Sequence, residues 1–315
     1  MKSILVDEQH TNMRIDKYLK EIFPRLPFGA MQKAFRKKDV KVNGIRIKQD
    51  YNVVSGDKLE VYIIDEILDG LNDKYDSNLN KGFTVVFEDA NIIIINKEQG
   101  IPVHPDREQT SDTLIDLVRN YLNVKGDYAP DNPASFPPSL CHRLDRNTGG
   151  LVIIALNRES LDIIMEKMET REIKKCYQCL VKGRMERQNE QLKAYLQKDE
   201  NKSMVFINDK KIAGSVEIIT KYRVLDYRSD IDVSQLEIEL VTGRTHQIRA
   251  HLAHIGHPVI GDGKYGTNAV NRPLGAKYQA LWAYKIKFDL KDAGHLNYLA
   301  GREFKVEPEF NIKGI

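Results

Sequence analysis

The chain has few of the residues that mark specialised protein classes, with 3 cysteines, 11 prolines, 20 glycines and one tryptophan among 315 residues. Three cysteines are too few for a disulfide framework and fit a reducing compartment. The low proline and glycine content excludes collagen, and 30% charged residues beside 41% hydrophobic residues exclude wholesale disorder. Aliphatic runs such as residues 92–95 are far shorter than the roughly 20 residues that cross a bilayer. We therefore expect a soluble globular protein of about two domains.

The charge of the chain is unevenly distributed, although its formal net charge is only +3. Residues 1–50 hold 12 lysines and arginines against 6 acidic residues, whereas residues 51–100 hold 4 against 10. A basic face of this kind is typical of proteins that bind a polyanion such as RNA. The opening residues, MKSILVDEQH, lack the charged and apolar stretches of a secretory signal, so we expect a cytoplasmic protein that binds no membrane.

The pattern in the first part of the chain predicts two helices followed by a hairpin. Apolar residues recur at helical spacing over residues 11–23, and a second helical stretch over residues 29–40 ends in basic residues. Asn43-Gly44 then separates two alternating strands, and this dipeptide readily supplies the positive φ angles of a tight type I′ turn. Residues 58–64 close the unit as a further strand.

Two helices, a basic corner and a hairpin within about 50 residues resemble the small RNA-binding module named after ribosomal protein S4. We therefore expect a small α/β RNA-binding domain over residues 1–64. The resemblance implies that its basic side chains contact phosphates, so that affinity for RNA falls with salt. The residues expected to do so are Arg14, Lys33, Arg36, Lys37 and Lys38. The alternative is a helical cap for the domain that follows.

The rest of the chain predicts a second, larger domain. Residues 65–81 are acidic, rich in Asn and Asp, and without a sustained period, which indicates a linker. Beyond it we expect a hairpin over residues 83–97, a helix over residues 113–121, and a buried strand over residues 151–156 followed by an amphipathic helix. This mixture favours an α+β fold with a mixed or antiparallel sheet over residues 82–315.

Two short motifs carry the residues best suited to chemistry. HRLDRNTGG places Asp145 between two arginines, in a turn that ends in glycine directly before the buried strand. Such a position presents a side chain at the edge of a sheet on a rigid scaffold. Far downstream, TGRTHQIRAHLAHIGHP places His246 and Arg249 at i and i+3, on one face of a short helix. Taken alone, each motif is equally typical of an ordinary salt-bridged cap.

Together with the tyrosine of KKCYQC, the two motifs resemble the RluA-type family of pseudouridine synthases over most of residues 83–290. The resemblance implies a catalytic domain with a long central sheet crossed by a cleft. It also implies isomerisation of a uridine within RNA, in which the N-glycosidic bond breaks, uracil turns, and its carbon 5 joins the ribose. This reaction needs no metal and no cofactor. An S4-type domain in front of this catalytic domain resembles the members that modify large-subunit ribosomal RNA, which we therefore expect as the partner, without an obligate protein partner.

The resemblance also assigns roles to individual residues. Asp145 matches the catalytic aspartate, Tyr177 the tyrosine that stacks on uracil, and Arg249 the basic partner of the aspartate. A guanidinium beside a carboxylate opposes the loss of charge that burial favours. An arginine wedge and an aromatic platform lower the few kcal/mol needed to extrude a base from a helix. Arg143 is expected to act as the wedge, and His142 and His246 are expected to bind the substrate beside it.

The chain departs from the family pattern at two places. Thr148-Gly149-Gly150 stands where T-S-G is usual, which removes a hydroxyl close to the aspartate. NKEQG stands where N-K-P-x-G is usual before His104, which removes a rigid proline. Neither change touches Asp145 or the residues matched with it, so the expected activity stands.

Other chemistries have less support in the sequence. Cys176 and Cys179 form a C-x-x-C pair, but no second pair exists to complete a zinc site. The histidines of residues 246–257 lack an H-E-x-x-H motif, which favours polar packing over metal binding. A glycoside hydrolase would pair Asp145 with Asp262, yet one tryptophan offers little for sugar stacking, and Asp262 is interpreted as a loop anchor. The remaining alternative is a non-catalytic RNA-binding or ribosome-assembly factor on the same fold.

Overall fold

The computed structural model describes residues 2–23, 26, 31, 34–35, 37–63, 68, 82–104, 113–130, 132–199, 204–310 and 312–313. The chain divides into two compact units. The first comprises residues 1–81 and 116–137, and the second comprises residues 82–115 and 138–315. None of the helices within the described ranges is both long and apolar enough to cross a membrane.

The first unit contains a four-stranded antiparallel sheet in the order β1-β4-β2-β3, and α1 buries Ile15 and Leu19 in its core. Asn43 and Gly44 have φ angles of 51° and 77°, which confirms the predicted tight turn. The first predicted helix is also confirmed, whereas the second helical stretch and the linker lie largely outside the described residues. The elements are β1 (Lys2–Leu5), η1 (Glu8–His10), α1 (Ile15–Ile22), β2 (Val40–Val42), β3 (Ile45–Arg46) and β4 (Lys58–Val61).

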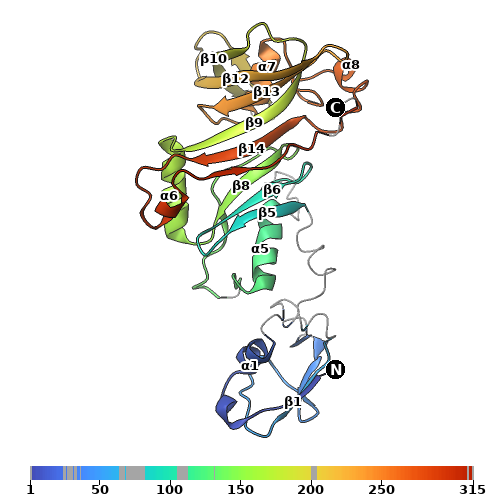
Figure 1. Ribbon diagram of the computed structural model, residues 1–315, viewed down its shortest axis with the longest axis vertical. Helices are drawn as coiled ribbons and strands as arrows, with labels where there is room; N and C mark the ends of the chain where they lie inside the picture. The colour runs from blue at the N-terminus through green and yellow to red at the C-terminus, as the bar shows by residue number, and fades with distance from the viewer. Residues whose placement is uncertain are drawn as a thin grey trace. The chain divides into compact units, whose positions relative to one another are not determined.

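The second unit is built on one large sheet in the order β11-β10-β12-β13-β9-β14-β8-β6-β5, with β15 beside β14 and β7 beside β8 (Figure 1). β14 and β8 pair in parallel, and the other strand pairs recorded in this sheet are antiparallel. The mixed α+β fold is the one that the sequence predicts. The strands are β5 (Phe83–Glu88), β6 (Ile92–Lys97), β7 (Ser139–Leu140), β8 (Gly149–Ala155), β9 (Ile173–Lys182), β10 (Asn189–Asp199), β11 (Met204–Asn208), β12 (Val216–Arg228), β13 (Val233–Leu240), β14 (Leu281–Phe288) and β15 (Glu303–Lys305).

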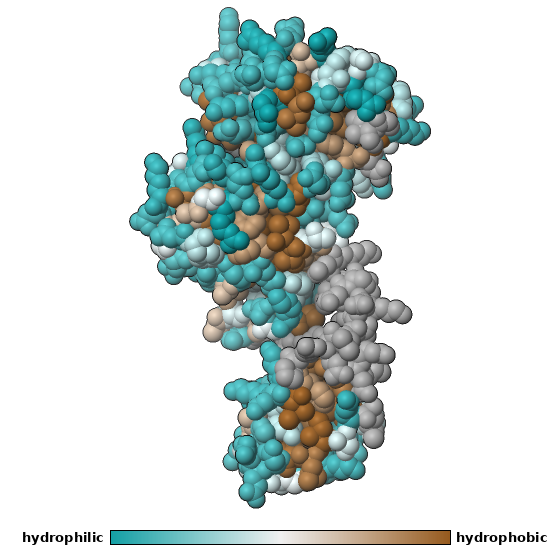
Figure 2. Space-filling view, viewed as in Figure 1, coloured by the Kyte–Doolittle hydropathy of each residue, from teal (hydrophilic) through white to brown (hydrophobic). Residues whose placement is uncertain are grey.

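Helices cover the sheet at different points. α6 packs against β8 and β9 around a core of aliphatic side chains, and α7 contacts β10, β11 and β12. All seven residues of β8 are buried, which agrees with its continuous apolar run. On the face seen in Figure 2, hydrophilic side chains cover most of this unit. The helices that lie wholly within the second unit are α6 (Arg158–Glu169), α7 (Gln247–His254), α8 (Asn268–Asn271) and η2 (Gly294–Leu299).

α5 (Leu114–Lys125) continues to residue 125, whereas the sequence predicts that this helix ends near residue 121. Leu122 and Val124 continue its buried face. Gly126 follows with a φ of 87°, the left-handed conformation that commonly ends a helix. The glycine, rather than the end of the clearest apolar period, therefore fixes this boundary.

Candidate active site

Asp145 lies in the turn between β7 and β8, and hydrogen bonds hold the main chain of this turn. The N–H of Thr148 donates to the carbonyl of Asp145 (3.0 Å). The carbonyl of Arg146 accepts from the N–H of Gly100 (2.9 Å) and from the ammonium of Lys97 (2.9 Å). The Asp145 side chain is 25% exposed, so a fixed main chain presents a carboxylate that solvent or substrate can reach.

Lys97, at the end of β6, has no exposed surface and supports the same turn. Its ammonium donates to the carbonyls of Glu98 (2.8 Å), Ile101 (2.9 Å) and Arg146. Burial lowers the pKa of Lys97 to about 7, and the negative charge of Asp145 opposes this shift. The loop that lacks the proline of the family pattern is therefore held by hydrogen bonds from a buried lysine.

Arg249, in α7, joins two carboxylates that are distant in sequence. Its Nη1 donates to Oδ2 of Asp145 (2.7 Å), while its Nε and Nη2 donate to Oδ2 (2.6 Å) and Oδ1 (2.9 Å) of Asp262. Burial disfavours the charged form of Arg249, but hydrogen bonds and charges from both aspartates raise its pKa above the ordinary value. The fold thus brings Asp145 and Arg249 together and keeps the guanidinium charged.

Asp262 has no exposed surface, and it binds more than its own loop. Its Oδ1 accepts from the N–H groups of Lys264 (2.8 Å) and Tyr265 (3.0 Å), which is the loop-anchoring role inferred from the sequence. Its contact with Arg249 was not foreseen. Burial alone would raise the pKa of Asp262, but the hydrogen bond and charge of Arg249 lower it. The only sequence signal for this contact was an aspartate in a glycine-rich loop.

His246 precedes α7 with a φ of 54°, the left-handed region that few residues other than glycine adopt. Its Nδ1 lies 2.9 Å from the hydroxyl of Tyr265, and its Nε2 lies 3.9 Å from Oδ2 of Asp145. Burial lowers the pKa of His246, while the charge of Asp145 acts in the opposite direction. The Tyr265 ring centre lies 5.3 Å from the Arg249 guanidinium, so Tyr265 packs against both residues.

Tyr177 lies in the middle of β9 and is 6% exposed. Its side chain is near enough to Asp145 for that negative charge to raise the pKa of its hydroxyl, with burial as the larger cause. The hydroxyl makes no hydrogen bond among the described residues. The structure therefore groups Tyr177 with Asp145, with little of the ring open to solvent.

His142 and Arg143 lie three and two residues before Asp145 in the chain but face different surroundings. Nε2 of His142 accepts from the N–H of Ile153 (3.2 Å), and Nδ1 is buried without a partner among the described residues. Burial and the charge of Lys175 hold the pKa of His142 well below its usual value. Arg143 is exposed. Arg143 is thus open to solvent, whereas the His142 ring supports β8.

The predicted RNA-binding residues belong to the first unit. Arg14 is exposed beside the start of α1, and its Nη2 lies 2.7 Å from Oδ2 of Asp16. Lys37 and Lys38 are exposed. Lys33 and Arg36 lie outside the described residues.

The histidines near α7 have separate partners. His251 bonds to the hydroxyl of Thr220 through Nδ1 (3.0 Å), His254 to Asp209 through Nε2 (2.8 Å), and His257 to a main-chain carbonyl. No group of three or more His, Cys, Asp or Glu side chains in the described part of the chain is placed to hold a metal ion. The contacts are those of polar packing.

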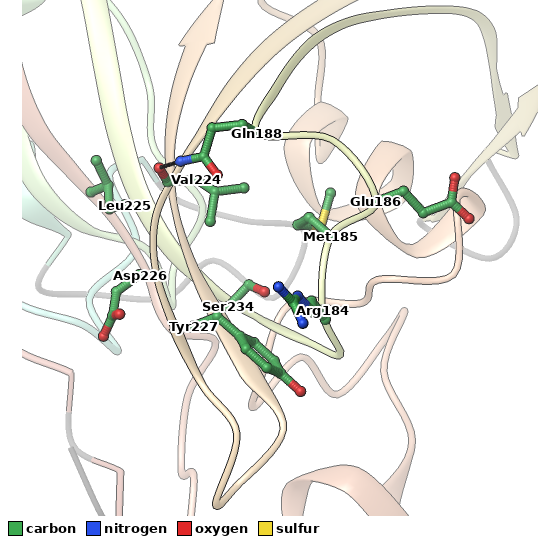
Figure 3. A pocket seen from close by; sticks show the side chains of 9 residues that line it. All are labelled: Arg184, Met185, Glu186, Gln188, Val224, Leu225, Asp226, Tyr227 and Ser234. Carbon is green, nitrogen blue, oxygen red and sulfur yellow. Dashed lines mark hydrogen bonds between the residues drawn. The ribbon is translucent and has the colours of Figure 1, made fainter.

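A hollow of about 410 Å³ lies beyond the end of β9. Neither Asp145 nor Arg249 nor Asp262 lines it. Figure 3 shows Arg184 and Tyr227 meeting in it, with the guanidinium 5.5 Å from the ring centre. Glu186 and Asp226 point outward on opposite sides. Its charges are mixed, which is unlike a phosphate site. The hollow is lined by Arg184, Met185, Glu186, Gln188, Val224, Leu225, Asp226, Tyr227 and Ser234.

The second unit has the fold of known pseudouridine synthases. The structure of human RNA pseudouridylate synthase domain containing 4 superimposes with a TM-score of 0.57 over 75% of this chain and 92% of that protein, at 19% identity. The structure of human RNA pseudouridylate synthase domain containing 1 gives a TM-score of 0.55 over 73% of this chain and 84% of that protein, at 20% identity. These likenesses define the class of fold.

Sequence comparison gives the family. The family model described as RNA pseudouridylate synthase matches residues 91–254. An uncharacterized RNA pseudouridine synthase of Mycoplasma pneumoniae is 32% identical over 96% of this chain and 95% of its own length. The ribosomal large subunit pseudouridine synthase C of Haemophilus influenzae is 29% identical over 92% and 87% respectively. The chain belongs to the RNA pseudouridylate synthase family, and it is therefore an isomerase that acts on uridine in RNA.

Proposed function

We propose that this enzyme converts uridine to pseudouridine at specific positions of large-subunit ribosomal RNA, with Asp145 as the catalytic carboxylate. The observation that carries the proposal is the 2.7 Å hydrogen bond from Arg249 to one oxygen of a partly exposed Asp145. Relatives from Haemophilus influenzae and Vibrio cholerae are named ribosomal large subunit pseudouridine synthase C, which supports the choice of RNA. From a ribosomal RNA substrate we infer that the protein acts in the cytoplasm.

The arrangement around Asp145 suits the bond changes of this isomerisation. The bond between N1 of uracil and C1′ of ribose breaks, uracil turns, and C5 bonds to C1′. C5 then loses its proton, and N1 gains one, so the product has the atoms of the substrate. Asp145 serves as nucleophile or proton acceptor, and the guanidinium of Arg249 holds its carboxylate in place through a hydrogen bond to Oδ2. Oδ1 of Asp145 has no hydrogen bond among the described residues and is the oxygen available to the substrate.

A uridine inside folded RNA must leave its stack to reach Asp145. The exposed side chain of Arg143 can enter the space that the base leaves, and the ring of Tyr177 supplies a face for uracil. His246 completes the substrate site beside them, 3.9 Å from the Asp145 carboxylate. We assign RNA binding to the S4-like residues 1–64, connected through residues 65–81 to the catalytic domain of residues 82–315.

Tritium release tests the proposal, because the hydrogen on C5 is lost only when the base is rejoined through that carbon. RNA labelled with 5-tritiated uridine is prepared as large-subunit ribosomal RNA, small-subunit ribosomal RNA and transfer RNA. Release is expected from the large-subunit RNA alone. Asp145→Asn should abolish it while RNA affinity stays within a few-fold, since the amide keeps the size of the side chain but not its charge.

Two outcomes would overturn parts of this assignment. Release from transfer RNA alone would exclude the ribosomal substrate. Substantial turnover by Asp145→Asn would exclude the aspartate as nucleophile or base. Pseudouridine mapping in cells with and without the gene then identifies the modified uridine.

A further inference from the structure

The carboxylate of Asp262 binds protein groups through both of its oxygens. Oδ1 accepts from Nη2 of Arg249 (2.9 Å) and from the N–H groups of Lys264 (2.8 Å) and Tyr265 (3.0 Å). Oδ2 accepts from Nε of Arg249 (2.6 Å). The side chain has no exposed surface. Asp262 therefore cannot reach a substrate, and any role in the reaction must act through Arg249 or the loop.

The contact with Asp262 determines which edge of the guanidinium faces Asp145. A guanidinium is a planar fork that prefers to bind a carboxylate through two parallel hydrogen bonds. Asp262 takes the edge made by Nε and Nη2, and Nη1 alone reaches Asp145. Asp145 consequently receives one hydrogen bond from Arg249, on Oδ2. A guanidinium released from Asp262 would be free to turn its forked edge toward Asp145 and bind both oxygens.

Tyr265 closes the other side of this arrangement. Its ring centre lies 5.3 Å from the Arg249 guanidinium, and its hydroxyl accepts from the N–H of Val205 (3.0 Å) and bonds to His246 (2.9 Å). Because Oδ1 of Asp262 binds the N–H of Tyr265, the same carboxylate fixes the guanidinium and the residue packed against it. The Arg249 guanidinium is therefore held along one edge by Asp262 and contacted by the ring of Tyr265.

We propose that Asp262 is a positioning residue that occupies the forked edge of Arg249, so that Asp145 keeps one oxygen free for the reaction. This inference rests on the proposed catalytic role of Asp145. Its consequence is specific: removing the Asp262 charge should slow the chemical step, because the guanidinium is then free to bind both oxygens of Asp145. RNA affinity should be unaffected, since Asp262 is buried.

Asp262→Asn is the first test. The remaining amide oxygen still accepts from the N–H groups of Lys264 and Tyr265, while the amide N–H₂ cannot accept from Nε of Arg249. We expect the single-turnover rate of tritium release to fall roughly 100-fold, the loss typical of a misplaced catalytic group, with RNA affinity within about twofold. The matched control is Asn271→Ala, because Asn271 binds the same loop through Gly261 and the Asp262 carbonyl without a contact to Arg249.

A double-mutant cycle separates positioning from a general effect on the fold. Arg249→Lys keeps a positive charge but has no fork to hold. In that background Asp262→Asn should change the rate by less than about threefold, because the two residues act as one unit. Equal losses in both backgrounds, or an Asn271→Ala variant as slow as Asp262→Asn, would overturn the proposal. So would a wild-type rate in Asp262→Asn while Asp145→Asn is inactive, a result that leaves the proposed function intact.

A measurement on folded protein covers the case in which Asp262→Asn does not fold. The Nε–H proton of Arg249 can be followed by NMR in the Asp145→Asn variant, where the contact with Asp262 is unchanged. Its exchange with water should remain as slow as in the wild type if Asp262 holds the guanidinium. Fast exchange in Asp145→Asn would show that Asp145 holds Arg249, and it would contradict the inference.

Discussion

Gly149 lies directly against the indole ring of Trp282, so closely that a Cβ at position 149 would be 2.4 Å from the ring. The contact arises because β8 and β14 pair in parallel, with Gly149 opposite Trp282. The family pattern has serine at this position, and here the indole fills the space that its side chain would take. Because Gly149 follows Asp145 by four residues, Trp282 forms part of the packing behind the turn that carries Asp145.

Gly149→Ser should therefore destabilise the protein. An overpacked core typically loses about 1–3 kcal/mol, which urea denaturation resolves. Combining it with Trp282→Leu should recover part of the loss, since the smaller side chain makes room and removes an indole N–H that is buried without a partner among the described residues. Gly243→Ser is the control, because nothing lies within 4 Å of a Cβ there. Equal effects at positions 149 and 243 would contradict this packing argument.

Tyr177→Phe separates stacking from proton transfer. Burial and Asp145 hold the pKa of the Tyr177 hydroxyl above its usual value, so the hydroxyl is protonated at neutral pH. If it takes part in proton transfer, the phenylalanine variant should release tritium roughly 100-fold more slowly with unchanged RNA affinity. Tyr177→Leu, which also lacks the ring, should weaken RNA binding as well. A phenylalanine variant with the full rate would confine Tyr177 to stacking.

The local pattern of the sequence was sufficient for most of the elements. Continuous apolar residues predicted the buried β8, and Asn43-Gly44 predicted the hairpin turn, because both signals depend on neighbouring residues. The two motifs that contain Asp145 and Arg249 lie about 100 residues apart in the chain. Their proximity was expected from the resemblance to a family, since periodicity carries no information about distant contacts.

The support around these residues was not predictable in the same way. Trp282 meets Gly149 through a parallel pairing of strands far apart in the chain. Asp262 sits in a glycine-rich loop, where aspartate usually binds nearby N–H groups, and it does so here while also holding Arg249. Neither the pairing of β8 with β14 nor the contact of Asp262 with Arg249 leaves a signal in the sequence around these residues.

Neutralising the basic corner of the first unit should weaken RNA binding in a salt-dependent manner. The substitutions Arg36→Gln, Lys37→Gln and Lys38→Gln together should make the slope of log affinity against log salt less steep. The change should correspond to the loss of up to about three phosphate contacts. Catalysis at saturating RNA should be unchanged. The control replaces both lysines with arginine, which keeps the charge and should keep the slope. An unchanged slope in the glutamine variant would favour the helical cap instead.

His251 should make the stability of the protein fall in mild acid. It is buried on α7, two residues from Arg249, and burial lowers its pKa from 6.5 to about 4, with the charge of His254 as the smaller cause. Between these two values the unfolded chain binds a proton that the folded chain does not. The free energy of unfolding therefore decreases as the pH falls from 6.5 to 4, by about 3 kcal/mol from this group.

Urea denaturation at pH 7, 5.5 and 4.5 measures the effect of His251. Glutamine can still bond to Thr220 but does not titrate, so the stability of His251→Gln should depend less on pH than that of the wild type over this range. His254→Gln is the matched control, because His254 lies on the same helix but is partly exposed and paired with Asp209. It should retain most of the acid loss. If His251→Gln loses as much stability between pH 7 and 4.5 as the wild type, another group is responsible for the loss.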